Sequence, residues 1–418
     1  MNGNRSRTTA LRLPPLSLSS TLLDVTPITS LDARVWLPGS EVPSQGEFAR
    51  VFDEWLDAHL EPEWMTPPHS PEAWLDVRTK FGRLLGNAGW LSVTWPRSLG
   101  GLGLPVDYRV LVVQALGRRG APEPMNQNAL GIFAPTVLKF GTKEQCERLL
   151  LPMAGHEEQW CQGFSEPEAG SDLAGLRTRA TPVDGGYRVS GQKVWTSFAA
   201  ISDRCYALVR TDTAAPKHQG ISLMALDLRA PGVTVRPLRN MTGAEEFSEV
   251  FFDDVFVPED DLIGDPGAGW AMATYALRQE RTLALAQRSM QMSHDVDALV
   301  DLWGSAPAER RAGLVHDMVD VWVRSRAVDA VVARAIVCDP DDGQAGALAS
   351  IGKLSWSEAH QELVATARRC SGPLAAVRIP PHDAWMDKAL AARAVTIYGG
   401  TSQIQRELIA RSMGLGSR

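Results

Sequence analysis

The sequence has few cysteines and no long apolar run, and both absences narrow the class of protein. Its five cysteines, spread over 418 residues, form no Cys-x-x-Cys pair. An odd and scattered set is a poor disulfide framework, so we expect a reducing compartment, which predicts a cytoplasmic protein. No uninterrupted apolar stretch approaches the roughly 20 residues that a membrane-spanning helix needs, so no membrane span is predicted.

An excess of basic residues and a cluster of metal ligands are also missing. The formal net charge is −7, which gives no reason to expect a nucleic-acid partner. The run His156-Glu157-Glu158 lacks the second histidine of a metalloprotease motif, and none of the eight histidines forms a ligand cluster with the cysteines. We therefore expect no bound metal.

Acidic residues are absent from the first 23 residues, which contain three arginines and many Ser and Thr. Two interpretations are open. Organellar transit peptides have this composition, whereas Pro14-Pro15 and the lack of a helical stripe favour a disordered tail. We expect residues 1–44 to be a flexible tail.

The remaining chain divides into three parts by the period of its apolar residues. Residues 45–158 show helical spacing, as at Phe48, Val51, Phe52 and Trp55, and Thr142-x-x-Gln145 predicts a capping box. Residues 159–265 alternate short apolar runs with turn formers and have no crossover helices, which predicts an antiparallel sheet or barrel. Residues 266–418 are helical again.

The predicted fold class is therefore α+β, with an all-α N-terminal domain, a β-barrel-like middle domain and a C-terminal helical bundle. In the middle domain we expect strands around residues 187–189, 205–209, 221–226, 233–235 and 250–252, and a turn at Asp253-Asp254. In the C-terminal part we expect helix breaks near residues 304–307, 340–343 and 378–381.

Three stretches combine small, hydroxyl and aromatic residues, as a site for a polar aromatic ligand requires. Small residues let backbone approach a ligand closely, hydroxyls reach its polar edge, and a Trp provides a flat apolar wall. The stretches are Gly163-Phe164-Ser165-Glu166-Pro167-Glu168-Ala169-Gly170-Ser171-Asp172, Gly191-Gln192-Lys193-Val194-Trp195-Thr196-Ser197 and Ile397-Tyr398-Gly399-Gly400-Thr401-Ser402-Gln403-Ile404-Gln405-Arg406.

Together these stretches resemble the flavin-binding middle domain and the closing signature of the acyl-CoA dehydrogenase family. The resemblance implies an FAD cofactor, α,β-dehydrogenation of an acyl-CoA thioester, and an electron-transfer flavoprotein as electron acceptor. It assigns cofactor contacts to Phe164, Ser165, Gly170, Ser171, Trp195, Thr196, Ser197, Gly400, Thr401 and Gln403, and substrate contact to Ser171 as well. The alternative is structural, with residues 165–172 a capped turn and Trp195 in the core. Glu168 stands where the family usually has Gly, which leaves the backbone geometry of this turn open.

Gly399 occupies the position at which many family members have their catalytic Glu. Some members instead have the base on the first long helix after the β domain, just before an Arg, and Glu280-Arg281 matches that pattern. Glu280 shares one helical face with Met272, Ala276 and the residues at 283 and 287. A carboxylate on an apolar face has a raised proton affinity, which suits removal of an α proton. We predict that Glu280 is the base and that Arg281 lies close to the acyl-CoA; the alternative is a surface Glu.

The chain lacks two segments by which typical family members reach the FAD pyrophosphate of a neighbouring subunit. All eleven Phe precede residue 257, so an Arg-x-x-Phe-Gly segment is absent, and Gly399-Gly400 is the last Gly-Gly pair. We expect either a heteromer with a related chain or a homo-oligomer, dimer or tetramer, whose own arginines substitute, with candidates Arg310, Arg311, Arg368 and Arg369. Two competing functions keep the fold: a flavin-dependent monooxygenase and a catalytically silent partner subunit.

Overall fold

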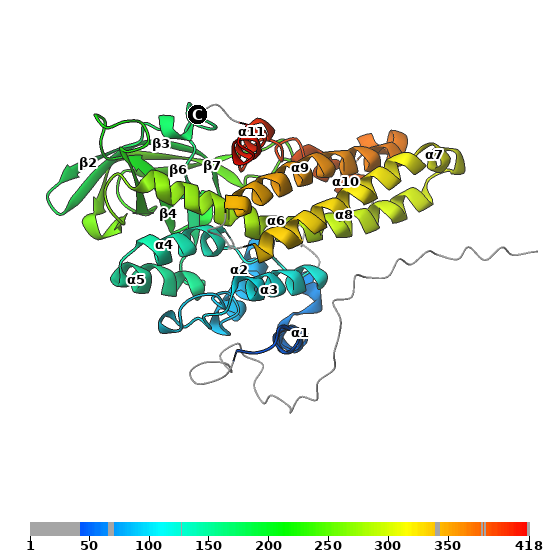
Figure 1. Ribbon diagram of the computed structural model, residues 1–418, viewed down its shortest axis with the longest axis horizontal. Coiled ribbons are helices and arrows are strands. Elements are labelled where there is room, and N and C mark those ends of the chain that lie inside the picture. Colours follow the sequence, from blue (N-terminus) through cyan, green and yellow to red (C-terminus); the bar gives the residue numbers. More distant parts are fainter. Residues whose placement is uncertain are drawn as a thin grey trace, which may run out of the picture.

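The computed structural model describes residues 42–65, 71–126, 128–338, 343–377, 379 and 382–415, without the side chains of residues 71–72, 280–284, 336–337 and 343–344. Figure 1 shows helices at both ends of the chain and a β-sheet between them in sequence, drawn at the left of the molecule. The predicted fold class is thereby confirmed. A flexible tail is expected at residues 1–44, of which residues 1–41 lie outside the described residues.

The N-terminal helices enclose a core that the apolar periodicity predicts. They are α1 (Gln45–His59), α2 (Pro71–Asn87), α3 (Val106–Arg118), α4 (Ala134–Phe140) and α5 (Lys143–Ala154), with the π-helical turn η4 (Ala129–Phe133) before α4. Phe48, Phe52 and Trp55 are buried on α1. The Thr142 side chain accepts from the Gln145 N–H and the Gln145 side chain from the Thr142 N–H, which confirms the predicted capping box at the start of α5.

The middle strands form one sheet, in the order β6-β7-β3-β2-β4-β5-β8, with β1 beside β4. Their bounds are β1 (Trp160–Gly163), β2 (Arg179–Val183), β3 (Gly186–Ser197), β4 (Arg204–Arg210), β5 (Ile221–Asp227), β6 (Val233–Leu238), β7 (Phe247–Pro258) and β8 (Leu262–Ile263). All five expected strands are present. The expectation of a wholly antiparallel sheet is wrong at two pairings, since β4 runs parallel to both β1 and β2.

The turn expected at Asp253-Asp254 is also wrong, because β7 runs through both residues. The register between β3 and β7 shifts between Val189 and Gly191, opposite this point, and Asp254 has a φ of 52°. A β-bulge of this kind absorbs the left-handed residue without ending the strand.

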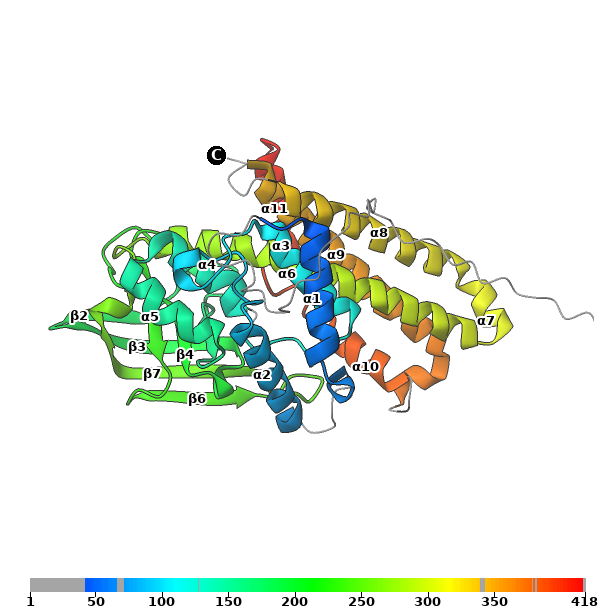
Figure 2. The ribbon, with the colours of Figure 1, turned by 90° about the horizontal axis from the view of Figure 1, so that it is seen from below.

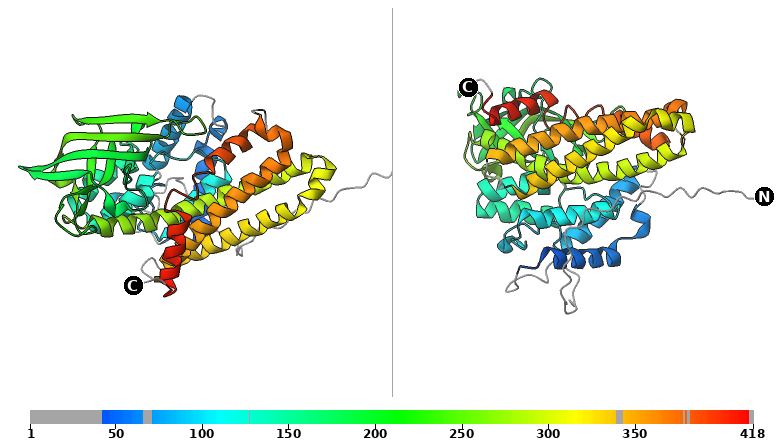
Figure 3. Two further views of the ribbon diagram at one scale, coloured as in Figure 1. Left: turned by 90° about the horizontal axis from the view of Figure 1, so that it is seen from above. Right: turned by 45° about the vertical axis from the view of Figure 1, so that its right-hand side comes forward.

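The C-terminal helices pack as a bundle around α6 (Gly269–Ser305), which is 37 residues long. The others are α7 (Ala308–Gly313), α8 (Val315–Val337), α9 (Gly343–Ser371), α10 (His382–Ala391) and α11 (Ser402–Ser412). The ends of α6 and α8 and the starts of α9 and α10 agree with the three predicted breaks. Figures 2 and 3 show α6 extending from beside the sheet into the bundle, so that one helix connects the two parts.

Among the described helices, none is long and apolar enough to cross a membrane. Over the same residues, no group of three or more His, Cys, Asp or Glu is placed to hold a metal ion.

His156, which follows α5, is fully buried with a left-handed backbone, at a φ of 55°. Neither ring nitrogen has a hydrogen-bond partner within the described structure. The ring lies against Gly82 of α2, where an added Cβ would come within 2.3 Å of it. Burial, and then the charges of Arg83 and Arg109, lower the pKa of His156 to about 4.

We expect the free energy of unfolding to fall as pH falls from 6.5 towards 4, because the unfolded state binds a proton that the folded state excludes. The stabilisation by neutral His156 is complete above pH 6.5 and is lost at about 1.4 kcal/mol per pH unit below it. The measurement is denaturant unfolding at several pH values between 7 and 5. His156→Asn, which tolerates the left-handed backbone, should flatten this dependence; equal slopes for both proteins would contradict the assignment.

Candidate active site

The first two stretches singled out in the sequence lie side by side in the β domain. The Val194 N–H donates to the Ser165 carbonyl at 3.0 Å. Lys193 Nζ donates to the Phe164 carbonyl at 3.2 Å and to Glu166 Oε1 at 2.8 Å. Segments 163–172 and 191–197 therefore form one structural unit, as their joint assignment to a single ligand site requires.

Glu166 and Lys193 form a buried ion pair at the centre of this unit, with side chains 8% and 0% exposed. The Glu166 carboxylate also accepts from the backbone N–H groups of Arg177, at 2.6 Å, and Thr178, at 2.9 Å. Burial opposes ionisation of Glu166, but the Lys193 ammonium and the two backbone donors outweigh it and lower its pKa. Burial also lowers the pKa of Lys193, against which the Glu166 carboxylate acts.

Glu168 fits the turn without backbone strain. The Glu166 and Ala169 backbones exchange two hydrogen bonds, of 3.1 and 3.0 Å, across the turn. Glu168 has no left-handed backbone angle, and its exposed carboxylate pairs with Arg177 Nη1 at 2.8 Å. The following Gly170 is exposed, and an added Cβ there would meet no atom within 4 Å.

Trp195 is 62% exposed, so the alternative that places it in the core is wrong. Its φ is 58° and that of Phe198 is 60°, two left-handed residues within four positions. The register between β3 and β7 shifts between Lys193 and Thr196, which leaves Trp195 at a bulge. Its indole contacts the edge of the Phe247 ring, with centroids 6.1 Å apart. Strained residues of this kind cluster at ligand sites, where the surrounding structure enforces them.

The surface around Trp195 fits a flavin. The indole offers an open apolar face, and the half-buried hydroxyls of Ser165 and Ser197 have no hydrogen-bond partner in the described part of the chain. Thr196 is different, because its side chain is fully buried and its hydroxyl has no partner there. Phe164 is also buried, in edge contact with Tyr206.

Position 280 lies within α6, but the side chains of Glu280 and Arg281 are outside the described residues. Met272 and Ala276, which precede position 280 on its helical face, are 1% and 2% exposed. Gly269 begins the helix in close contact with Ser222 of β5, where a Cβ would come within 2.6 Å of backbone. The start of the helix is thus tied to the sheet, and its buried face leads to position 280.

The closing stretch forms a tight turn before α11. Gly400 has a φ of 90°, and an added Cβ would come within 2.5 Å of Gln405 Nε2. That nitrogen donates to the carbonyls of Gly399 and Gly400, at 3.1 and 3.2 Å. Thr401 caps α11 by accepting from the Ile404 N–H, and Gln403 is exposed. The stretch is therefore a rigid cap, of which Gln403 remains accessible.

Three of the four arginines proposed to replace the missing pyrophosphate contacts are already engaged. Arg369 pairs with Asp317 at 3.1 Å and with Glu362 at 2.6 Å. Arg310 donates to the Cys370 carbonyl and Arg311 to the Gly304 carbonyl. In the described structure, Arg368 is exposed and has no carboxylate partner.

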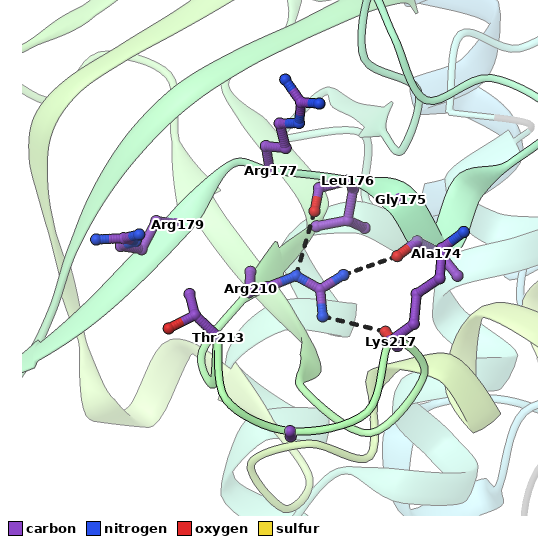
Figure 4. A pocket seen from close by; sticks show the side chains of 9 residues that line it. Ala174, Gly175, Leu176, Arg177, Arg179, Arg210, Thr213 and Lys217 are labelled. Atoms are coloured by element: carbon purple, nitrogen blue, oxygen red, sulfur yellow. Dashed lines mark hydrogen bonds between the residues drawn. The ribbon is translucent and has the colours of Figure 1, made fainter.

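A cationic pocket, which the sequence interpretation missed, lies next to the first stretch. Figure 4 shows the side chains that line it, among them Arg177, Arg179, Arg210 and Lys217. Arg210 is held in place by three backbone carbonyls, those of Ala174, Leu176 and Lys217. Lys217 binds Asp172 at 2.6 Å, which connects the pocket to the first stretch. The sequence signal was Arg177-Thr178-Arg179, directly after this stretch.

Arg179 is the pocket cation that remains available for an anion. It is exposed, and within the described residues it has no carboxylate partner, whereas Arg177 pairs with Glu168 and Lys217 with Asp172. Its strand β2 lies beside β4, with Arg179 in register with Arg210. The pocket thus combines the guanidinium of Arg210, which backbone carbonyls hold in place, with that of Arg179, which has no carboxylate partner among the described residues.

Sequence models of three domains match almost the whole of the described chain. They are those of the acyl-CoA dehydrogenase N-terminal domain, at residues 43–157, middle domain, at residues 161–255, and C-terminal domain, at residues 267–414. The Mycobacterium tuberculosis protein named acyl-CoA dehydrogenase IpdE1 is 34% identical over 377 residues, which cover 88% of this chain and 97% of the relative. The bovine mitochondrial short-chain specific acyl-CoA dehydrogenase is 25% identical, over 78% of this chain and 80% of its own.

A solved structure with the same architecture is that of the ChsE4-ChsE5 complex from Mycobacterium tuberculosis. It has a TM-score of 0.76 and 26% identity, and the match covers 91% of this chain and all of the other. The chain belongs to the acyl-CoA dehydrogenase family.

Trp195→Ala should weaken FAD retention, because it removes the apolar wall beside Ser197. The measurement is the dissociation constant of FAD for the apo-protein, with Phe256→Ala, another exposed aromatic residue of the β domain, as the control. Equal retention in the two variants would show that the exposed indole does not contact the cofactor.

Proposed function

We propose that this chain, an FAD-dependent oxidoreductase of the acyl-CoA dehydrogenase family, removes the α and β hydrogens of an acyl-CoA thioester with Glu280 as the base. Two observations support the proposal: the two middle-domain stretches join next to an exposed, strained Trp195, and a cationic pocket follows the first stretch. An aromatic cofactor and a phosphate-bearing substrate are the two ligands that these neighbouring features suit.

Each group in the proposed mechanism has a defined task. Bound FAD supplies the acceptor for the β hydride. Glu280 removes the α proton, and hydrogen-bond donors at the thioester carbonyl stabilise the enolate-like charge that develops there. Ser165 and Ser197 would hold the polar edge of the flavin, while Trp195 would cover the cofactor and limit the access of water. Ser171 and Arg281 contact the substrate, and Gly170, Gly400, Thr401 and Gln403 complete the cofactor site.

The proposed partners follow from the family and from the missing segments. Electrons would pass from the reduced enzyme to an electron-transfer flavoprotein. The chain would assemble as an oligomer, and the structurally similar ChsE4-ChsE5 pair is a complex of two different chains. The same missing segments favour a second candidate function, in which this chain completes the cofactor site of a related, catalytically active chain.

The cationic pocket supports the choice of a CoA ester over a simple acid. CoA carries several phosphate charges, and arginines are well suited to bind phosphate because their planar guanidinium forms paired hydrogen bonds. Arg179 is the pocket cation best placed to do so, since no carboxylate neutralises it among the residues described.

Arg179→Glu should raise the KM for an acyl-CoA by about tenfold and leave kcat almost unchanged, because it removes a charge-assisted contact with a phosphate. The same acyl group on N-acetylcysteamine, which lacks the nucleotide, should show no change. Arg236→Glu, the same charge reversal at an exposed residue of edge strand β6, is the matched control. A KM increase that is equal for both thioesters would exclude the pocket as the phosphate site.

A further inference from the structure

We propose that the buried Glu166–Lys193 ion pair positions the flavin-contacting segments, so that its loss impairs the cofactor site even where the fold survives. The proposal rests on the proposed function, since it concerns the FAD site of that reaction. Glu166 directly follows Ser165, and Lys193 precedes Trp195 by two residues. The pair thus lies between the two stretches that the cofactor would touch.

The ion pair lies where the pairing between β3 and β7 is interrupted. Lys193 is in register with Val250 of β7, but the register resumes only at Thr196, opposite Ser248. Between these two pairings the Val194 N–H donates to the Ser165 carbonyl instead. Lys193 is therefore where β3 leaves β7 and joins the segment around Ser165, and its ammonium secures that segment through Phe164 and Glu166.

Two residues with strained backbone angles follow Lys193 closely in the sequence. Trp195 and Phe198 adopt left-handed angles that non-glycine residues rarely occupy. Such residues persist only where the surrounding structure over-determines them. The ion pair and the Val194–Ser165 hydrogen bond provide this constraint just before Trp195, so the orientation of its exposed indole depends on them.

The Glu166 carboxylate extends the same constraint to a third segment. Its two oxygens accept from the N–H groups of Arg177 and Thr178 as well as from Lys193. These residues lead into β2, whose first residue is Arg179 of the cationic pocket. One carboxylate therefore fixes the flavin edge, the Trp195 bulge and the entry to the proposed phosphate site relative to one another.

A general stabilising role would not require charges here. Two buried ions lose their hydration, so an apolar pair of similar size often stabilises a fold as well or better. Breaking such a pair on one side is costly, whereas removing both charges is often tolerated. The pair therefore has a positioning role and not only a structural one if a variant without both charges keeps its fold but loses the cofactor site.

The test compares Lys193→Met, the double variant Glu166→Gln/Lys193→Met, and Glu166→Asp, which keeps both charges but retracts the carboxylate by one methylene. The control is Arg188→Met, which removes an exposed ion pair with Asp254 from the same strand. For each assembled protein we would measure thermal unfolding of the apo form, the dissociation constant of FAD, and the visible circular dichroism of the bound flavin.

Lys193→Met should unfold at a lower temperature, because it leaves the Glu166 carboxylate buried and unpaired. The double variant should recover part of that loss, because it removes the unpaired charge but leaves one of the Arg177 and Thr178 N–H groups without an acceptor. It should bind FAD about tenfold more weakly than the wild type, with an altered circular dichroism band. Glu166→Asp should show the same FAD defect, and Arg188→Met none.

Wild-type FAD affinity and circular dichroism in the folded double variant, or in Glu166→Asp if the double variant does not fold, would overturn the proposal. None of these readouts uses an acyl-CoA. A negative result in these measurements would therefore not contradict the proposed reaction. Equally, a failure to reduce the flavin with any acyl-CoA would not contradict the positioning role of the ion pair.

Discussion

Glu280→Gln should lower the rate of flavin reduction by an acyl-CoA by several orders of magnitude while FAD and acyl-CoA still bind. Glutamine keeps the size of the side chain but cannot accept the α proton, and a positioned base contributes about 10²–10⁴-fold or more. The buried face of α6, with Met272 and Ala276 before position 280, favours a site shielded from water. The measurement is single-turnover reduction under anaerobic conditions, which isolates the chemical step from product release.

The matched control is Glu259→Gln, the same change at an exposed acid of the β domain, which should reduce at the wild-type rate. Raising the pH should not rescue Glu280→Gln, because no titratable group remains at that position. Near-normal reduction in Glu280→Gln would end the assignment of the base to α6.

The isolated chain should contain well below one FAD per chain, and co-expression with a related chain that has an Arg-x-x-Phe-Gly segment should raise the content. The reason is electrostatic, because burying a pyrophosphate without cations is unfavourable. Arg369 is already paired with two carboxylates, and Arg310 and Arg311 donate to backbone carbonyls. Among the described residues, Arg368 is the one candidate with neither a carboxylate partner nor a carbonyl contact, and one such guanidinium replaces only part of what the two missing segments supply.

FAD and protein are quantified separately in the homo-oligomer and in the co-purified complex. Arg368→Ala distinguishes the alternatives within the homo-oligomer. About one FAD per chain in the isolated wild type, reduced by Arg368→Ala, would show that the chain supplies its own cation and needs no partner. A monomer with full FAD occupancy would contradict both forms of assembly.

Local sequence features were enough to predict the elements but not the contacts between distant segments. Period and capping residues predicted α1, α5 and the five main strands, because these depend on neighbours within a few positions. The Glu166–Lys193 pair joins residues 27 positions apart, and the cationic pocket depends on the parallel register of Arg179 with Arg210. Neither pairing leaves a periodic signal in the chain.

The two β-bulges between β3 and β7 could not be predicted from the sequence for a related reason. A register shift of one residue moves every later side chain to the other face of a sheet. Whether Trp195 is buried or exposed therefore depends on the register shift between Lys193 and Thr196. The prediction of a turn at Asp253-Asp254 is wrong for the same reason, because the bulge at Asp254 lets β7 continue through both residues. The predicted flavin residues remain proposals that the exposed Trp195 and the free hydroxyls of Ser165 and Ser197 support.

The most direct test of the proposed reaction is anaerobic titration of the FAD-loaded protein, in its native assembly, with a panel of acyl-CoAs while the visible flavin absorbance is followed. We predict that at least one acyl-CoA bleaches the flavin and is converted to the corresponding α,β-unsaturated thioester in equal amount. A flavin that stays oxidised with every acyl-CoA, in an assembly saturated with FAD, would contradict the account.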